Sequence, residues 1–479
     1  MTATQTRGRP LWTFMVTGIA LFMVSLDSLV VTNALPSIRT DLGTGLEGLE
    51  WTVNAYTLTF AVSLLIGAAL GDRYGRRRVL LAGLTVFTAS SAVAALAPSI
   101  GVLVAARAVQ GLGAAMVTPL TLTLLAGALP RERRGLAFGA WSAMSGLAVA
   151  LGPVVGGAIT QGVSWQWIFW INVPIGALLL PLAAAKLAES RGPAARLDLV
   201  GSALATAGLF GVVLGLVRGN GHGWTSPTVL TSLAAGAVLL VAFLAWERRT
   251  GTPALPLRMF ASRGFSATNA TALAMSFGMF GSVFLLAQFL QGVQGYSPLE
   301  AGLRTLPWTA MPVLAAPLAG AFSDRVGPHR LVVAGLLLQA AGLAWLAAVT
   351  TVDVAYPTLI PGFVLAGTGM GLFFAPVARL ALGFVEPALE GAASGASNAL
   401  RQLGTVLGIA VLSAVFSATG GFASGQAFVN GLIPALWVGC AVIVGAALVG
   451  LLIPSPTSPA GRPAGSRLAV EREPALTTA

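Results

Sequence analysis

Fourteen apolar stretches recur along the 479-residue chain, and they constrain its fold more than any other feature. An apolar helix of about 20 residues spans the hydrocarbon core of a bilayer. Hydrophobic residues make up 56% of the sequence and charged residues only 9%, which is too little polar surface for a soluble protein of this length. The 59 glycines suit close helix packing within a membrane. The sequence therefore predicts an all-α polytopic membrane protein.

The apolar stretches give one predicted span each, separated by short polar or basic segments. The spans are expected at residues 12–34, 49–70, 79–97, 100–128, 136–161, 165–186, 198–217, 228–246, 264–290, 298–322, 331–349, 357–380, 393–418 and 431–453. Clustered tryptophans open the sixth span, where an aromatic ring at the membrane interface is favoured.

A charged turn occurs twice between apolar spans, at Gly71–Arg78 and at Gly320–Arg330. Both copies read Asp-Arg-x-Gly-x-x-Arg, and a turn repeated in this way indicates two related halves. Its positions after the second and tenth spans fit six spans per half with two inserted between them. Arginines alone would only set topology, but an aspartate followed by a glycine suggests a hydrogen-bonded hinge. The predicted gating residues are Asp72, Arg73, Gly75, Arg76, Asp324, Arg325 and Gly327.

The net charge of +11 at pH 7 is distributed unevenly over the predicted loops. With the N-terminus inside, 22 of the 27 basic residues fall in segments on the cytoplasmic side. This bias follows the positive-inside rule and makes a nucleic-acid partner unnecessary. The N-terminal segment with Arg7 and Arg9 is expected to be retained, since it lacks a signal-peptide cleavage site. Both termini are predicted to be cytoplasmic.

Asp27 is the only acidic residue well inside a predicted span. A carboxylate there costs at least about 2.5 kcal/mol, so it needs a partner, a cavity or a proton. Asp27 and Arg107 each lie about seven residues, roughly 10 Å, from the outer end of their spans. Their shared depth allows an ion pair or a proton-controlled coupling, whereas a merely structural carboxyl would only hydrogen-bond neighbouring helices.

Two other spans contain residues that are unusual inside a membrane helix. Gly152-Pro153-Val154-Val155-Gly156-Gly157 lies late in the fifth span, where proline removes a backbone donor and glycine permits close packing. Ordinary small-residue packing explains this segment equally well. Arg401 lies roughly 12 Å into the thirteenth span from the cytoplasmic side. It either lines a cavity or pairs with a helix end.

Several kinds of site are absent from the sequence. There is no phosphate-binding Gly-x-x-x-x-Gly-Lys-Ser/Thr, so ATP-driven transport is not expected. His-Glu-x-x-His and Gly-x-Ser-x-Gly are also missing, so enzymatic activity is not expected. The single cysteine, Cys440, excludes an internal disulfide and a cysteine-based metal site. His222 and His329 are isolated on predicted loops, and no metal or cofactor is expected.

These residues resemble the major facilitator superfamily in its fourteen-helix drug:proton antiporter branch. The resemblance covers residues 12–453. It rests on five ordered segments, namely Leu26–Pro36, Asp72–Arg78, Gly320–Arg330, Arg107–Ala115 and Gly152–Gly157. The chain departs from the family at Ala68, where glycine is usual, and at Gln166, where arginine is frequent.

The resemblance implies two six-helix bundles that rock around a central cavity. It assigns residues 12–187 to the first bundle, 188–263 to two inserted helices with linkers and 264–453 to the second bundle. Residues 1–11 and 454–479 would be a cytoplasmic N-terminus and a disordered cytoplasmic tail. The implied function is proton-driven export of amphipathic or cationic compounds, including drugs and antibiotics, from a bacterial cytoplasmic membrane. A monomer powered by the proton gradient is expected.

Carried over to this sequence, the family pattern makes Asp27 the protonatable group and Arg107 its coupling partner. Asp72 and Arg76 would form the cytoplasmic gate, and Gly152-Pro153 the antiporter kink. Spans bordering the cavity supply candidate substrate contacts, although packing explains such residues as often. These candidates are Asn33, Tyr56, Gln110, Trp141, Met144, Gln288, Trp308, Asn398 and Arg401.

Two other functions compete with export. A proton-coupled importer of a nutrient or peptide is one, although the Glu-x-x-Glu-Arg signature of peptide importers is absent. A membrane sensor or intramembrane enzyme is the other, although no large soluble domain or catalytic constellation accompanies it. Abundant alanine, glycine and arginine with one lysine suggest a GC-rich bacterial genome. Self-protection against a secreted antibiotic fits that origin.

Overall fold

The computed structural model describes residues 10–129, 131–192, 198–251, 253, 255–386 and 389–454. The side chains of residues 65, 131–143, 220, 324 and 391 are also outside the described part. The predictions for the side chains of Trp141 and Asp324, for segment 1–9 and for the tail after residue 454 therefore lie outside the described residues.

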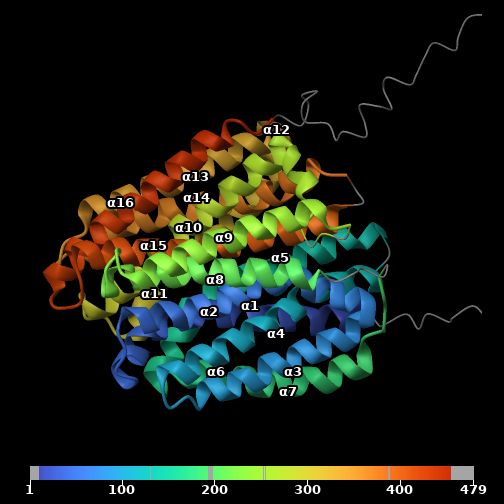
Figure 1. Ribbon diagram of the computed structural model, residues 1–479, viewed down its shortest axis with the longest axis horizontal. Coiled ribbons are helices and arrows are strands. Elements are labelled where there is room, and N and C mark those ends of the chain that lie inside the picture. The colour runs from blue at the N-terminus through green and yellow to red at the C-terminus, as the bar shows by residue number, and fades with distance from the viewer. Residues whose placement is uncertain are drawn as a thin grey trace, which may run out of the picture.

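The first half of the chain folds into one bundle of helices, which we call the N bundle (Figure 1). Its helices are α1 (Pro10–Asp41), α2 (Leu46–Tyr74), α3 (Arg76–Ala95), α4 (Ile100–Ala128), α5 (Arg131–Gly162), α6 (Trp167–Trp170) and α7 (Asn172–Lys186). The predicted sixth span is divided into α6 and α7 at Ile171.

The second half forms the C bundle, and two helices lie between the halves in sequence. The inserted helices are α8 (Leu199–His222) and α9 (Pro227–Arg249). The C bundle contains η1 (Leu257–Ala261), α10 (Arg263–Gly292), α11 (Pro298–Thr309), α12 (Met311–Val326), α13 (Pro328–Val349), α14 (Tyr356–Gly383), α15 (Glu390–Thr419) and α16 (Gly425–Gly450). The predicted tenth span is broken at Ala310, and Pro312 is the second residue of α12, which follows the break.

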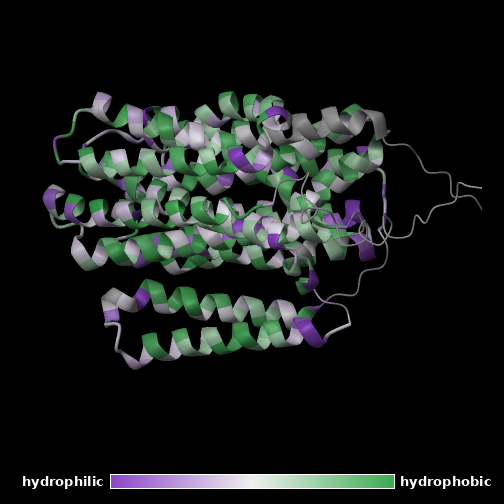
Figure 2. Ribbon diagram, turned by 90° about the horizontal axis from the view of Figure 1, so that it is seen from above, coloured by the Kyte–Doolittle hydropathy of each residue, from purple (hydrophilic) through white to green (hydrophobic). Residues whose placement is uncertain are grey.

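The length and apolarity of these helices confirm a polytopic membrane fold. Within the described residues, 13 helical segments are long and apolar enough to cross a membrane, and α2 makes a fourteenth when its two parts count as one span. The helical ribbons in Figure 2 carry mostly the colours of hydrophobic and neutral residues. No strand occurs in the described ranges.

The inserted helices α8 and α9 pack against each other at one side of the molecule. Figures 1 and 2 together place this pair outside the two bundles. Only α8 makes extensive further contact, with α2 of the N bundle and α15 of the C bundle. The pair therefore covers one junction between the bundles without entering either.

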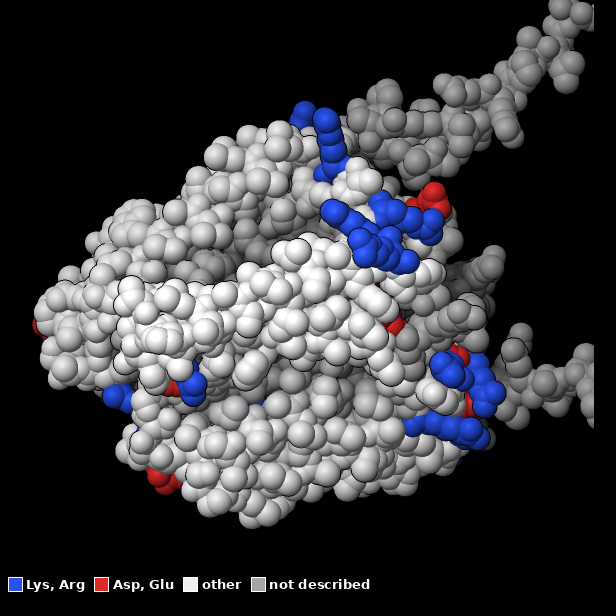
Figure 3. Space-filling view, in the orientation of Figure 1, with Lys and Arg blue, Asp and Glu red and all other residues white. Residues whose placement is uncertain are grey.

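The bundles meet along two pairs of helices, α2 with α15 and α5 with α11. One buried apolar cluster contains residues of both bundles, including Val30 of α1 and Phe284 of α10. Figure 3 shows that lysines and arginines gather at one end of the molecule. We call this the basic end, and it includes the turn between α2 and α3 with Arg76, Arg77 and Arg78.

Candidate functional site

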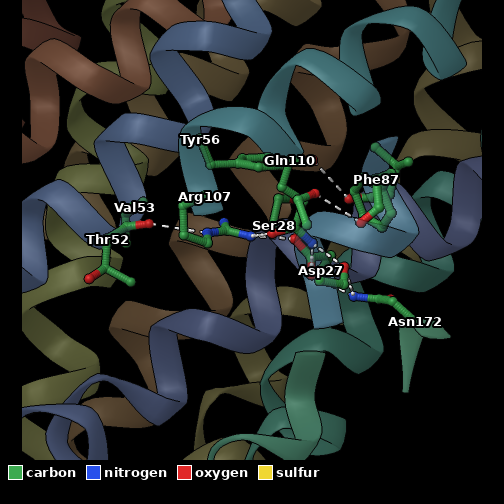
Figure 4. A network of polar contacts seen from close by, with 12 residues as sticks. Asp27, Ser28, Thr52, Val53, Tyr56, Phe87, Arg107, Gln110 and Asn172 are labelled. Carbon is green, nitrogen blue, oxygen red and sulfur yellow. Dashed lines mark hydrogen bonds and ion pairs between the residues drawn. The ribbon is translucent and has the colours of Figure 1, made fainter. Parts of the chain in front are cut away.

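Asp27 of α1 and Arg107 of α4 form an ion pair in the interior of the N bundle (Figure 4). The distance from Arg107 Nη1 to Asp27 Oδ2 is 2.5 Å. The two side chains are 0–1% exposed, so neither charge reaches solvent. The shared depth of the two residues in sequence thus corresponds to direct contact in the structure.

The Asp27 carboxylate accepts two further hydrogen bonds, from Gln110 of α4 and Asn172 of α7. Gln110 Nε2 lies 2.8 Å and Asn172 Nδ2 lies 2.7 Å from Asp27 Oδ1. Gln110 Nε2 also donates to Ser91 Oγ of α3 at 2.7 Å. Side chains of α4 and α7 therefore hold the carboxylate of α1, with α3 linked through Ser91, and each of these hydrogen bonds to the carboxylate comes from a nitrogen donor.

The Arg107 guanidinium is enclosed by groups from α2 and α4. It donates to the backbone oxygen of Thr52 at 3.2 Å and to Gln110 Oε1 at 2.7 Å. Its Cζ lies 4.2 Å from the ring centroid of Tyr56, which supports a cation on its face. The pair is fully desolvated, so removal of one partner would leave an uncompensated charge at a cost of about 3–5 kcal/mol.

A small apolar cavity, the central cavity, lies between the bundles. Its volume is about 30 Å³, and its lining includes Asn33, Pro153 and Trp308. About 10–15 Å³ of volume measured in this way holds one water molecule, so there is room for only a few waters. The central cavity therefore has no room for a drug-sized molecule in this conformation.

A second cavity, the C-bundle cavity, has a volume of about 100 Å³ and lies among α10, α14 and α15. Asn398 and Arg401 of α15 and Asn269 of α10 line it. The lining comes from the first turns of α10 and α15 and the last turns of α14, so the cavity lies toward the basic end.

Hydrogen bonds join the two bundles in the half of the molecule away from the basic end. Gln291 Nε2 of α10 donates to the backbone oxygen of Asn33 at 2.9 Å. Thr309 Oγ1 of α11 donates to the backbone oxygen of Ala150 in α5 at 3.2 Å. The Arg39 guanidinium lies 3.8 Å from the ring centroid of Phe422. These contacts close this end of the interface.

The glycines of the predicted antiporter motif permit two close helix contacts. A methyl group at Gly152 would lie 2.7 Å from Leu29 Cβ, and one at Gly156 would lie 2.6 Å from the Val30 oxygen, both on α1. A methyl group at Gly157 would lie 2.2 Å from the Pro298 oxygen at the start of α11. Gly157 therefore permits the close contact between the two bundles. The other two glycines permit close packing of α5 on α1 within the N bundle.

Pro153 takes part in the same region of α5 through its carbonyl oxygen. Asn33 Nδ2 donates to this oxygen at 2.7 Å. A methyl group at Gly302 of α11 would lie 2.3 Å from it. One proline carbonyl is thus in close contact with α1 and with the C bundle.

The charged turn between α2 and α3 has a defined local structure. Gly75 adopts φ +113°, a conformation that favours glycine, and its N–H donates to the Gly71 oxygen. Asp72 and Arg76 form an ion pair of 2.8 Å. Glu189, in the segment after α7, accepts hydrogen bonds from the backbone N–H of Arg77 at 3.0 Å. A carboxylate here stabilises the N-terminus of α3.

The second turn, between α12 and α13, repeats the backbone geometry of the first. Gly327 has φ +93° and its N–H donates to the Ser323 oxygen. Arg325 is exposed. Among the described residues no carboxylate accepts a hydrogen bond at this helix start, so Glu189 distinguishes the two copies. The gating role of either turn stays a prediction.

Six of the predicted substrate contacts line a cavity or surround Arg107. Asn33 and Trp308 line the central cavity, and Asn398 and Arg401 line the C-bundle cavity. Tyr56 and Gln110 line neither and belong to the network around Arg107 instead.

The remaining two described candidates line neither cavity. Gln288 is 3% exposed and its Nε2 donates to the Phe284 oxygen of its own helix. Met144 lies near Gly18 of α1, where a methyl group would be 3.6 Å from its Cε.

Sequence reasoning missed a second buried acid, Glu50 of α2. Its side chain is 3% exposed, and Oε2 has no hydrogen-bond partner. Ser413 of α15 is its polar neighbour across the bundle junction. Glu50 was placed at the edge of a predicted span, but α2 begins at Leu46, so the residue lies one turn inside the helix. Asp27 is therefore not the only buried acid among the described residues, although Glu50 lies near a helix start and not well inside a span.

Asn172, Ser91 and Glu189 were also missed as functional candidates. Asn172 is a single polar residue in an apolar run and Ser91 follows Ser90, and such polar residues are common in membrane spans. Glu189 lies in a segment expected to be a polar linker, and nothing local to it indicates contact with a turn more than 100 positions earlier.

Comparison with known proteins agrees with the membrane fold. The sequence profile of the Major Facilitator Superfamily matches residues 17–409 and again 269–477. Multidrug resistance protein Stp of Mycobacterium tuberculosis (strain CDC 1551 / Oshkosh) is 36% identical over 85% of this chain and 76% of its own length. The tetracenomycin C resistance and export protein of Streptomyces glaucescens is 34% identical over 96% and 86%. Cephamycin export protein CmcT of Amycolatopsis lactamdurans is 40% identical over 85% and 84%.

Solved structures share the fold at lower sequence identity. A D-xylose-proton symporter superposes with a TM-score of 0.67 at 17% identity, covering 95% of this chain and 99% of its own. A POT family transporter in complex with a thioalcohol-conjugated peptide gives a TM-score of 0.70 at 14% identity, covering 92% and 95%. At this identity the likeness shows the architecture alone.

Proposed function

Because this chain belongs to the major facilitator superfamily, we propose that it exports drugs, antibiotics or related amphipathic molecules from a bacterial cell in exchange for protons. Three relatives that are 34–40% identical over most of this chain are named for resistance or export. The transport is by alternating access across the cytoplasmic membrane, with both termini inside. The single observation that supports proton coupling best is the buried ion pair of Asp27 and Arg107.

Asp27 is the proposed proton carrier. Binding of a proton removes its negative charge, so the attraction to Arg107 is lost while Gln110 and Asn172 still contact the carboxyl. The Arg107 cation then keeps its carbonyl contact with Thr52 and its place on the Tyr56 ring. A change of charge in a desolvated network spanning α1, α2, α4 and α7 alters how these helices pack, and this links protonation to the conformation of the N bundle.

The described conformation corresponds to the cytoplasm-facing state of such a cycle. The positive-inside rule assigns the basic end to the cytoplasm. The contacts between α5 and α11 join the bundles at the other end, and the C-bundle cavity lies toward the basic end. Opening to the outside would separate Gly157 from Pro298 and Thr309 from Ala150.

The proposed partners are protons, a small-molecule substrate and the lipid bilayer. The protein works as a monomer without a cofactor, and the proton gradient supplies the energy. Chemical conversion of the substrate is not part of the proposal. The inserted helices α8 and α9 lie outside the bundles, so they do not contribute to the Asp27 network.

The test uses Asp27→Asn in the full-length protein. The matched control is Glu47→Gln, because Glu47 is a carboxylate on α2 that is 43% exposed and paired with Arg218. Everted membrane vesicles are loaded with a pH-sensitive dye and given a panel of antibiotics. We expect Asp27→Asn to abolish drug-dependent proton movement and resistance, while Glu47→Gln keeps both. Full resistance with Asp27→Asn at normal membrane levels would overturn the assignment.

A further inference from the structure

The C-bundle cavity contains a cation without a partner. Arg401 of α15 is half-buried in its wall, and none of the ion pairs among the described residues includes it. Its Cζ lies 5.2 Å from the ring centroid of Phe374. Arg107, by contrast, is fully paired with Asp27. A guanidinium deep within a membrane bundle is costly unless an anion or polar groups compensate it.

Polar side chains without partners surround this cation. Thr268 and Asn269 of α10 are 1% and 2% exposed. Thr268 Oγ1, Asn269 Oδ1 and Ser397 Oγ have no hydrogen-bond partner within the protein. Buried polar groups of this kind are normally satisfied, so three unsatisfied ones around one cavity indicate a site for a polar ligand. The hydroxyls of Thr268 and Ser397 are available as donors.

The charge of the cavity selects the ligand. The residues that line it are Thr268, Asn269, Ala272, Phe374, Val377, Ala378, Ala381, Leu382, Ser394, Ser397, Asn398 and Arg401, and none is acidic. The other buried cation of the spans, Arg107, is neutralised within the N bundle. A cationic compound would be repelled by Arg401, while a carboxylate or another oxyanion would satisfy the guanidinium and both hydroxyls.

We propose that the C-bundle cavity binds an oxyanion group of the exported molecule, with Arg401 as its counter-ion. This deepens the proposed function and rests on it. Phe374 supports the guanidinium on one face. The cavity of about 100 Å³ takes the oxyanion group, and Val377, Ala378 and Ala381 contact the carbon atoms next to it, while the rest of the ligand extends beyond the cavity. Of the amphipathic or cationic compounds expected from the sequence, this proposal favours amphipathic molecules that carry an anionic group.

The binding test compares three fluorescent probes with a common ring system, namely pyrenebutyrate, its methyl ester and pyrenemethylamine. The full-length protein is placed in phosphatidylcholine nanodiscs. We expect the wild type to prefer pyrenebutyrate, Arg401→Gln to weaken it by about tenfold or more, and Arg401→Lys to restore most of the affinity. Binding of the ester should not change, which also shows that the variants are folded. Arg218→Gln is the matched control, because Arg218 is a half-exposed cation of α8 that does not line the cavity.

Equal loss of acid and ester binding, or unchanged acid binding in Arg401→Gln, would overturn the proposal. An anionic lipid headgroup offers the same chemistry, so the measurement is repeated with phosphatidylglycerol in the nanodiscs. Loss of pyrenebutyrate binding in these discs would assign the cavity to lipid rather than substrate. Retained binding would support the substrate assignment.

A transport measurement in vesicles distinguishes failure of the oxyanion site from failure of the proposed exporter function. Vesicles that show proton-linked export without any preference between the acid and the amine would disprove the oxyanion site and leave the exporter intact. Selective binding of pyrenebutyrate without proton-linked movement of any compound would disprove the exporter and leave the site intact.

Discussion

Gly75 and Gly327, 252 positions apart, hold the same backbone conformation between consecutive helices. Their φ and ψ angles are +113° and 124° in the first turn and +93° and 128° in the second. In each case the glycine N–H donates to the oxygen four residues earlier, and the glycine both ends one helix and precedes the next. Since only glycine adopts these angles without strain, the repeated sequence corresponds to a repeated structural requirement.

The two glycines differ in what surrounds them, and this predicts unequal effects of alanine. A methyl group at Gly75 would lie 2.8 Å from Glu189 Cδ, whereas one at Gly327 would meet only the His329 ring at 3.2 Å. Backbone strain should cost about 1–3 kcal/mol at either position. We expect Gly75→Ala to lower the melting temperature more than Gly327→Ala, because it also displaces Glu189 from the start of α3. Equal shifts in a thermal unfolding assay would contradict a structural role for Glu189.

The Asp27–Arg107 pair predicts strongly non-additive stability. Arg107→Gln leaves a buried carboxylate without a cation, which should cost about 3–5 kcal/mol. Adding Asp27→Asn removes that charge, so we expect the double variant to be more stable than Arg107→Gln alone. Thermal unfolding of the wild type, the two single variants and the double variant in the same detergent measures the interaction energy between the two residues. Additive shifts would mean that the two charges do not stabilise each other.

Much of the fold could be predicted from sequence because apolar length and charge asymmetry act locally. The spans, the two halves and the two inserted helices follow from runs of apolar residues and from one repeated turn. The breaks at Ile171 and Ala310 could not be predicted, since proline is tolerated inside other spans, such as Pro119 in α4 and Pro434 in α16. Whether a proline divides a helix depends on packing that a single segment does not reveal.

For the candidate site, the sequence predicted how deep each residue lies in the membrane but not which way its side chain points. Asp27 and Arg107 were expected at the same depth, and their contact follows when α1 and α4 are neighbours. Tyr56 and Gln110 were assigned to the cavity because polar and aromatic residues on such spans can face either way. The direction of each side chain depends on the rotation of its helix about its own axis. In the structure both side chains contact Arg107. Glu50 was missed for a different reason, because the predicted span began three residues too late and placed Glu50 at its edge instead of one turn inside the helix.

Glu50 gives a prediction about stability. Oε2 has no partner, and both amide atoms of Asn54, one helical turn further along α2, are also unpartnered. Glutamine at position 50 could donate to Asn54 Oδ1 while removing a carboxyl group from an apolar junction. We expect Glu50→Gln to raise the melting temperature, whereas Glu47→Gln at the exposed start of α2 should not. A lower melting temperature for Glu50→Gln would show that the carboxyl has a stabilising partner in the folded protein.

Gly157 gives a prediction about the transport cycle. The nearest atoms to an added methyl group are the backbone oxygen and carbon of Pro298, at 2.2 and 2.7 Å, and a backbone cannot move aside as a flexible side chain can. Overpacking of this kind costs about 1–3 kcal/mol. The cost applies only where α5 and α11 touch, so Gly157→Ala should disfavour the state that is closed at this end by roughly 5- to 150-fold.

The shift can be measured from the accessibility of the central cavity. A cysteine introduced at Val149, which lines that cavity, is labelled from outside with a membrane-impermeant maleimide in a background lacking Cys440. We expect faster labelling and slower export with Gly157→Ala. Gly162→Ala is the control, because a methyl group there meets nothing within 4 Å on the same helix end. Unchanged labelling with reduced export would mean that Gly157 affects transport by some route other than closure of the α5–α11 contact.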